Sequence, residues 1–186
     1  MRFMRQICCA EIFALLLLVP SVALRGQAVR LLPNRPLPRD SGSLSVSVTP
    51  TQVNFNLVAR GTAVGSTSVN ITTTWTSVTL GSSITLYGYF TSSSAALTGS
   101  NSGANIPSSA VFGEMTTGLP TSYTAFTQTC PFGVAGASLQ LFSETVTGSD
   151  TGNRTDALSL MLDLSSLREL PADTYTGTLI IEAQGI

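Results

Sequence analysis

Residues 147–156, TGSDTGNRTD, carry the oxygen-bearing side chains of this chain that are best suited to binding a metal ion. Asp150, Asn153 and Asp156 follow one another closely here, among two glycines. Calcium prefers carboxylate and amide oxygens held on a flexible loop. The same residue types also build ordinary tight connections between strands, and their spacing matches no EF-hand. The stretch is therefore a candidate calcium site, with a plain hairpin loop as the alternative, and we expect no other metal site.

A second candidate site consists of aromatic side chains that could bind a ligand such as a sugar. Tyr87 and Tyr89 fall on the opposite parity from Leu86 within an alternating apolar segment, so we expect both to be exposed. Exposed aromatic side chains are where binding energy concentrates. Trp75 shares its parity with Ile71, which predicts that it packs in the core.

The chain lacks the residues that most catalytic mechanisms require. The chain contains no histidine and no lysine, which excludes Ser–His triads, Ser–Lys dyads and Schiff bases. No GxSxG motif and no glycine-rich phosphate loop occurs. Two carboxylates would suffice for a glycosidase, but Asp156 and Asp163 are predicted at opposite ends of one strand, about 23 Å apart. We therefore expect a protein that is not an enzyme and that binds no cofactor.

Residues 1–28 have the layout of a secretory signal peptide. Two arginines precede an apolar run over residues 7–19 that is short for a membrane span, and small residues follow. The small-x-small pattern predicts cleavage after Ala23 or after Ala28. An uncleaved anchor helix is the alternative. We expect an exported protein, extracellular or periplasmic, with no membrane association beyond export.

The remaining chain divides into a linker rich in proline and arginine at residues 29–42 and a domain at residues 43–186. From residue 40 onward, nine carboxylates face three arginines, a formal charge of −6. Such a surface has no electrostatic footprint for nucleic acid. Removal of the leader leaves Cys130 as the only cysteine, so we expect a buried thiol and no disulfide within the chain.

Alternating apolar segments dominate the domain and predict strands. In ALSLMLDL, for example, Leu158, Leu160 and Leu162 are expected to point inward. The other expected strands cover residues 44–48, 53–58, 69–75, 84–90, 138–146 and 174–183, with an irregular or edge strand at 123–127. Together they predict an all-β fold, an antiparallel immunoglobulin-like β-sandwich of one domain, with a closed barrel as the alternative.

Three further local expectations follow from the same patterns. Residues 165–170, SSLREL, look like a helical turn. Residues 92–108 are small, polar and glycine-rich, which favours a long surface connection. In the last strand, Leu179 and Ile181 are expected to face the core, while Glu182 and its neighbours of the same parity form a mostly wet outer face.

Two segments resemble known families. Residues 48–72, VTPTQVNFNLVARGTAVGSTSVNIT, resemble the opening strands of bacterial secreted immunoglobulin-like modules. Residues 155–186, TDALSLMLDLSSLRELPADTYTGTLIIEAQGI, are similar to the C-terminal end of spore-coat-protein-U-type and related fimbrial subunits. This resemblance implies a secreted surface subunit that polymerises by donating a strand to its neighbour, with no catalytic residues.

We therefore expect a secreted, non-enzymatic structural or adhesive surface protein, a fimbrial or coat-like subunit. Its partners would be other copies of itself or related surface subunits, joined by β-strand pairing. The alternative is a monomeric secreted module that binds a carbohydrate or another ligand through Tyr87, Tyr89 and residues 92–108. A strand-exchanging subunit is expected to have an incomplete sheet that is open beside the final strand.

Overall fold

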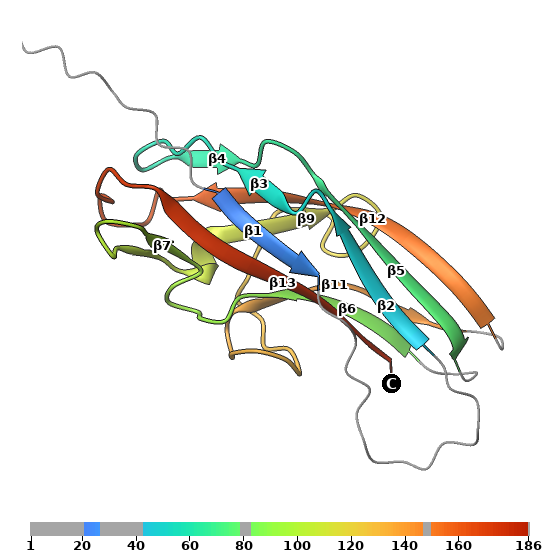
Figure 1. Ribbon diagram of the computed structural model, residues 1–186. Coiled ribbons are helices and arrows are strands. Elements are labelled where there is room, and N and C mark those ends of the chain that lie inside the picture. Colours follow the sequence, from blue (N-terminus) through green and yellow to red (C-terminus); the bar gives the residue numbers. More distant parts are fainter. Residues whose placement is uncertain (1–20, 27–42, 79–82, 147–149, 186) are drawn as a thin grey trace, which may run out of the picture.

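Two β-sheets packed face to face form the computed structural model, which describes residues 21–26, 43–78, 83–146 and 150–185 (Figure 1). The expected all-β sandwich of one domain is confirmed. The described strands form two separate open sheets and do not close on one another, so the barrel alternative is wrong. The predicted leader up to residue 20 and the predicted linker lie outside the described residues.

The first sheet, sheet A, contains the last strand of the chain at its centre. Its order is β11 (Ser138–Thr145), β6 (Ser83–Tyr89), β13 (Tyr175–Gly185), β1 (Ser21–Gly26) and β3 (Gln52–Asn54). A short hairpin, β7 (Leu97–Gly99) and β8 (Asn105–Ile106), pairs with the beginning of β13. The pairs within this sheet are antiparallel except for β1 and β13, which run parallel.

The second sheet, sheet B, is antiparallel and covers the inner face of sheet A. Its order is β10 (Thr124–Ala125), β9 (Val111–Met115), β12 (Asp150–Asp163), β5 (Val69–Val78) and β2 (Ser43–Thr49). The short strand β4 (Thr62–Val64) pairs with the end of β12. A 3-10 turn at Ser108–Ala110 leads into β9 and is the only helical element among the described residues.

The core lies between the sheets because alternating side chains of each strand point into it. Leu158, Leu160 and Leu162 of β12 are buried, as the alternation predicts. The expected core position of Trp75 and the expected burial of Cys130 are also confirmed. The largest fully buried side chains are Tyr175, Phe55, Phe90, Phe126, Ile71, Ile84, Leu86, Leu97, Ile106, Met115, Leu139 and Leu141.

The expectation of a long surface connection at residues 92–108 is wrong. Leu97 and Ile106 are fully buried, and their hairpin crosses the beginning of β13. Gly177 permits this crossing, since a Cβ there would lie 2.0 Å from the carbonyl oxygen of Ala96. The composition misled the prediction because polar residues of the segment, Ser100, Asn101 and Ser102, bind a buried carboxylate, Asp173, that follows 71 to 73 residues later in the sequence.

At residues 165–170 the expected single turn is present, closed by the Leu167 N–H donating to the Leu164 carbonyl, and it does not extend into a helix. One other local expectation is corrected. The outer face of β13 is exposed at Thr176 but dry at its end, where Glu182 and Gln184 are 6% and 5% exposed. There Glu182 accepts a hydrogen bond from the Tyr89 hydroxyl.

Candidate functional site

The most distinctive feature of the fold is the strand that lies beside β13 on the side away from β6. On the β6 side, β13 pairs antiparallel over Ile180–Gly185. On the other side, β1 pairs parallel, with Val22–Gly26 opposite Gly177–Ile181 (Figure 1). β1 also pairs antiparallel with β3 through Ser21–Ala23. We call the position in sheet A between β13 and β3 the slot.

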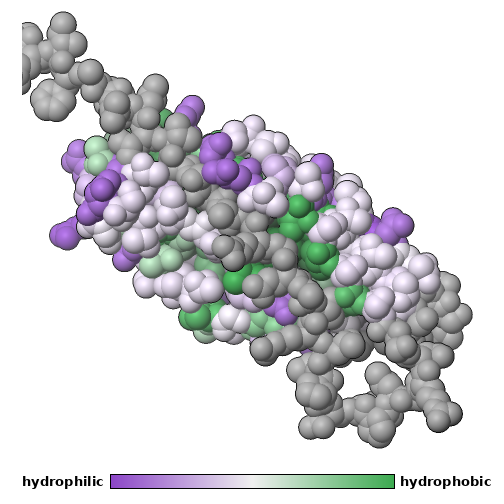
Figure 2. Space-filling view, in the orientation of Figure 1, coloured by the Kyte–Doolittle hydropathy of each residue, from purple (hydrophilic) through white to green (hydrophobic). Residues whose placement is uncertain are grey.

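The slot adjoins the apolar interior of the sandwich. Leu179 and Ile181 of β13 and Val53 of β3 are fully buried beside it. From sheet B, β2 packs against both β1 and β13, and its Val46 and Val48 are partly buried on the core. Figure 2 shows apolar atoms gathered along the middle of this face, in the region of β2 and β13. The slot is therefore bordered by core residues of both sheets.

The strand in the slot comes from the predicted leader. Cleavage after Ala23 would fall within β1, and cleavage after Ala28 would remove the whole strand. Sequence reasoning missed β1 because the leader pattern accounted for these residues. Ile180 and Ile181 place apolar side chains on both faces of β13, which is typical of a strand covered on both faces, but they do not reveal which segment pairs with it.

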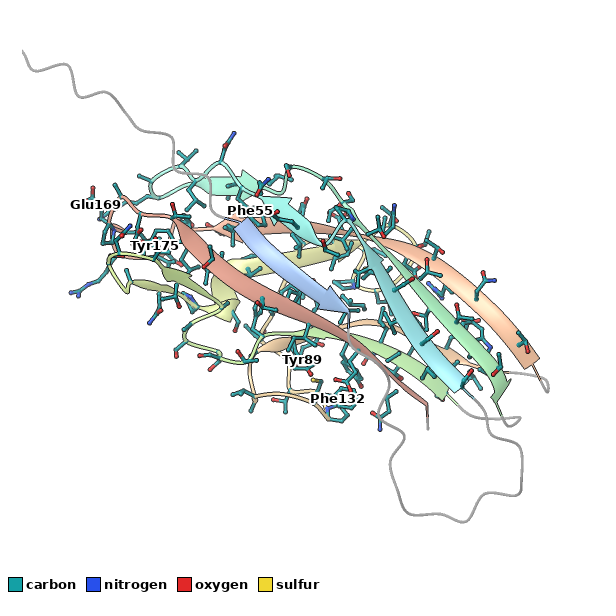
Figure 3. The ribbon with its side chains drawn as sticks, in the orientation of Figure 1. Phe55, Tyr89, Phe132, Glu169 and Tyr175 are labelled. Atoms are coloured by element: carbon teal, nitrogen blue, oxygen red, sulfur yellow. The ribbon has the colours of Figure 1, made fainter. Side chains whose placement is uncertain are left out.

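The two tyrosines predicted to bind a ligand lie side by side on the outer face of sheet A, where Phe132 covers them. Ring centroids of Tyr87 and Tyr89 lie 6.0 Å and 6.4 Å from that of Phe132. Figure 3 shows Tyr89 and Phe132 adjacent and far from Phe55 and Tyr175. The expected exposure is wrong for Tyr89, which is 9% exposed, whereas Tyr87 is half-buried. Burial raises the pKa of Tyr87.

The covering segment is held closely to these rings. Gly133 has a φ of +73° and lies so near Tyr89 that a Cβ would come within 2.5 Å of the ring. The thiol of Cys130 donates to the carbonyl of Phe132. Beneath them, the Tyr89 hydroxyl donates to a carboxylate oxygen of Glu182 at 2.9 Å. The aromatic cluster thus holds one loop on sheet A instead of presenting an open platform.

The three residues of the candidate calcium site do not form a loop. Asp150–Asp163 is one continuous strand, β12, paired with β5. Asn153 is exposed and lies on the opposite face of the strand from the buried Asp156. Among the described residues, no group of three or more acidic, cysteine or histidine side chains is placed to hold a metal ion.

Asp156 serves a different purpose, because it pairs with an arginine on the same face of β12. Arg154 donates from Nε to Asp156 at 2.7 Å and contacts Glu144 of β11 at 3.2 Å. It also donates to the Thr117 carbonyl and lies over the ring of Phe142, 4.7 Å from its centroid. The hydrogen bond to Asp156 raises the pKa of Arg154. We call this group the arginine clamp; it ties sheet B to sheet A.

At the beginning of β13, Asp173 organises the β7–β8 hairpin. Its carboxylate accepts hydrogen bonds from the backbone N–H and hydroxyl of Ser102, both at 2.7 Å, and from the N–H of Asn101 at 2.9 Å. Ser100 donates to it as well. These donors, Ser102 first, hold the pKa of Asp173 far below its usual range. The carboxylate has a structural role here, since it is enclosed by donors from its own chain.

Comparison of the chain with protein-family models and with curated protein sequences gave no match. Within the described part of the chain, no helix is long and apolar enough to cross a bilayer. Among the features described, the slot is the one that supports a proposal of function.

Proposed function

We propose that the protein is an exported, non-enzymatic structural subunit of a surface assembly, and that a strand from a neighbouring copy completes its β-sandwich. One observation carries this proposal: the strand in the slot belongs to the predicted leader. A processed chain loses part or all of that strand, and on the side of β13 away from β6 no other strand among the described residues pairs with Gly177–Ile181.

An emptied slot is a strong site for strand addition. Backbone N–H and C=O groups of β13 would lose their partners on one side, and β3 would lose its ladder partner. Such an edge is a template for pairing with another chain. Leu179, Ile181 and Val53 would also lose cover at the slot, which adds an apolar driving force.

A second copy of this chain is the occupant that the structure favours. After a cut at Ala23, each copy keeps Leu24–Gly26, which pair with Leu179–Ile181 in the structure, so the same residues of a neighbour can pair there. The donation therefore requires the cut after Ala23. Sixteen residues separate β1 from β2, and a chain of that length spans at most about 55 Å. Exchange of an identical element between copies is a low-cost route to assembly, and a head-to-tail exchange that does not close forms an open chain.

The alternative, a monomeric ligand-binding module, receives less support. Its candidate residues Tyr87 and Tyr89 are packed beneath Phe132, and Tyr89 is engaged with Glu182. The hairpin within residues 92–108 is fixed by Asp173.

The experiment compares the oligomeric state of two chains by size-exclusion chromatography with light scattering over a range of concentrations. The chain of residues 24–186 is expected to form concentration-dependent assemblies. The chain of residues 43–186, which keeps all of β2, is expected to be monomeric. A matched control is Leu24→Pro with Arg25→Pro in the longer chain, which removes backbone donors from the strand. Monomers of 24–186 at every concentration would refute the proposal.

A further inference from the structure

The geometry points to a device that keeps the slot closed until the leader is removed: in the unprocessed chain, residues 21–26 plug the chain's own slot, and cleavage opens it. This inference rests on the proposed function, because it concerns when that slot accepts a strand. It adds a regulatory step that the strand exchange itself does not require.

The predicted cut after Ala23 divides β1 at a specific point. Ser21, Val22 and Ala23 are the residues that pair with β3, opposite Gln52–Asn54. Leu24–Gly26 pair only with β13. Cleavage there removes every pair between β1 and β3, and two of the five pairs between β1 and β13. The remaining three residues are held along one side only.

The alternative cut, after Ala28, removes β1 entirely, so both predicted cleavages open the slot. The plug is suited to release because its pairing with β13 is parallel, which is slightly less stable per residue than antiparallel pairing. β3 stays in place without it: the Ser66 N–H donates to the Asn54 carbonyl at 2.8 Å, and Phe55 bridges to Gly65. The emptied slot therefore keeps both walls.

The test uses the full chain before and after treatment with signal peptidase in mild detergent. The probe is a fluorescein-labelled peptide of residues 19–28, VPSVALRGQA, followed by fluorescence anisotropy. We expect the unprocessed chain to bind the peptide at least tenfold more weakly than the processed chain. The control chain, Ala23→Leu with Ala28→Leu, blocks both cuts and should stay closed after treatment. The control peptide carries Val22→Pro and Ala23→Pro, which removes backbone donors toward both walls.

The outcomes separate this inference from the proposed function. Equal binding by the unprocessed and processed chains would overturn the plug alone, whereas no binding by the processed chain would overturn the slot and the proposed function together. Amide hydrogen exchange at residues 52–54 and 177–181 gives a second readout that needs no peptide. Faster exchange at these residues after processing is expected, with unchanged exchange at residues 84–89; unchanged exchange at all of them would contradict the plug.

Discussion

The two sides of β13 differ in where their partner strands come from. On one side, β6 belongs to the body of the domain and pairs antiparallel over six residues. On the other, β1 belongs to the predicted leader and pairs parallel over five. Leu86 of β6 and Val53 of β3, the strand beyond the slot, both have no exposed surface. The two sides of β13 therefore differ in the origin of the neighbouring strand and not in the burial of these flanking residues.

The largest expected effect comes from removing β13 itself. Deletion of residues 179–186 should abolish cooperative folding, because both neighbours lose their central partner and Leu179, Ile181 and Ala183 leave the core. Near-UV circular dichroism and urea unfolding would measure this. The matched control begins at residue 29, lacks only β1 among the described strands, and should still unfold cooperatively. A cooperative transition in the C-terminal deletion would contradict the central role of β13.

Two core substitutions with smaller effects on stability test whether the two sides of β13 are independent. Leu86→Ala on β6 should lower the free energy of unfolding by about 3 kcal/mol, whether or not residues 21–26 are present. Val53→Ala on β3 should cost about 1.5 kcal/mol when β1 is present, because two methyl groups leave a buried site. In the chain that begins at residue 29 the cost should fall, since the wall of the slot is then partly exposed. Urea unfolding of both variants in both chains forms a double-mutant cycle. An equal cost of Val53→Ala in the two chains would show that the packing of Val53 does not depend on β1.

The arginine clamp supplies the third prediction, on the closed side of the sandwich. Arg154→Met should cost about 3 kcal/mol of unfolding free energy, because Asp156 would remain buried with the Thr117 hydroxyl but without its cationic partner. Glu144→Gln should cost about 0.5 kcal/mol or less, because Glu144 is largely exposed. Thermal unfolding distinguishes the two. Equal losses of stability in the two variants would show that Asp156 does not depend on the arginine. A change in peptide binding to the slot would show that the clamp and the slot are coupled.

The periodic parts of the fold could be predicted from sequence, and the parts fixed by distant contacts could not. Leu158, Leu160 and Leu162 follow the strand period, so their burial was readable. Asp150 and Asn153 have the composition of a turn, yet pairing with β5 extends β12 through them. Local propensity is overridden when a neighbouring strand supplies the ladder.

The site shows the same limit. The strand face on which Tyr87 and Tyr89 lie could be predicted from their parity. The packing of Phe132 on them could not, because Phe132 lies more than forty residues later in the chain. β1 escaped prediction for another reason: its residues fit the leader pattern, and its place in the sheet depends on an opening between β13 and β3. Such an opening exists only in the assembled fold.

The arginine clamp also bears on how the domain resists proteases that cut after basic residues. The domain has no lysine and carries only Arg60, Arg154 and Arg168. Arg60 and Arg168 lie in exposed connections, whereas Arg154 is held within β12 by its ion pairs. A folded domain thus offers trypsin two points of attack, and the third becomes available only when β12 leaves sheet B. Tryptic cleavage after Arg154 therefore reports whether the sandwich is intact.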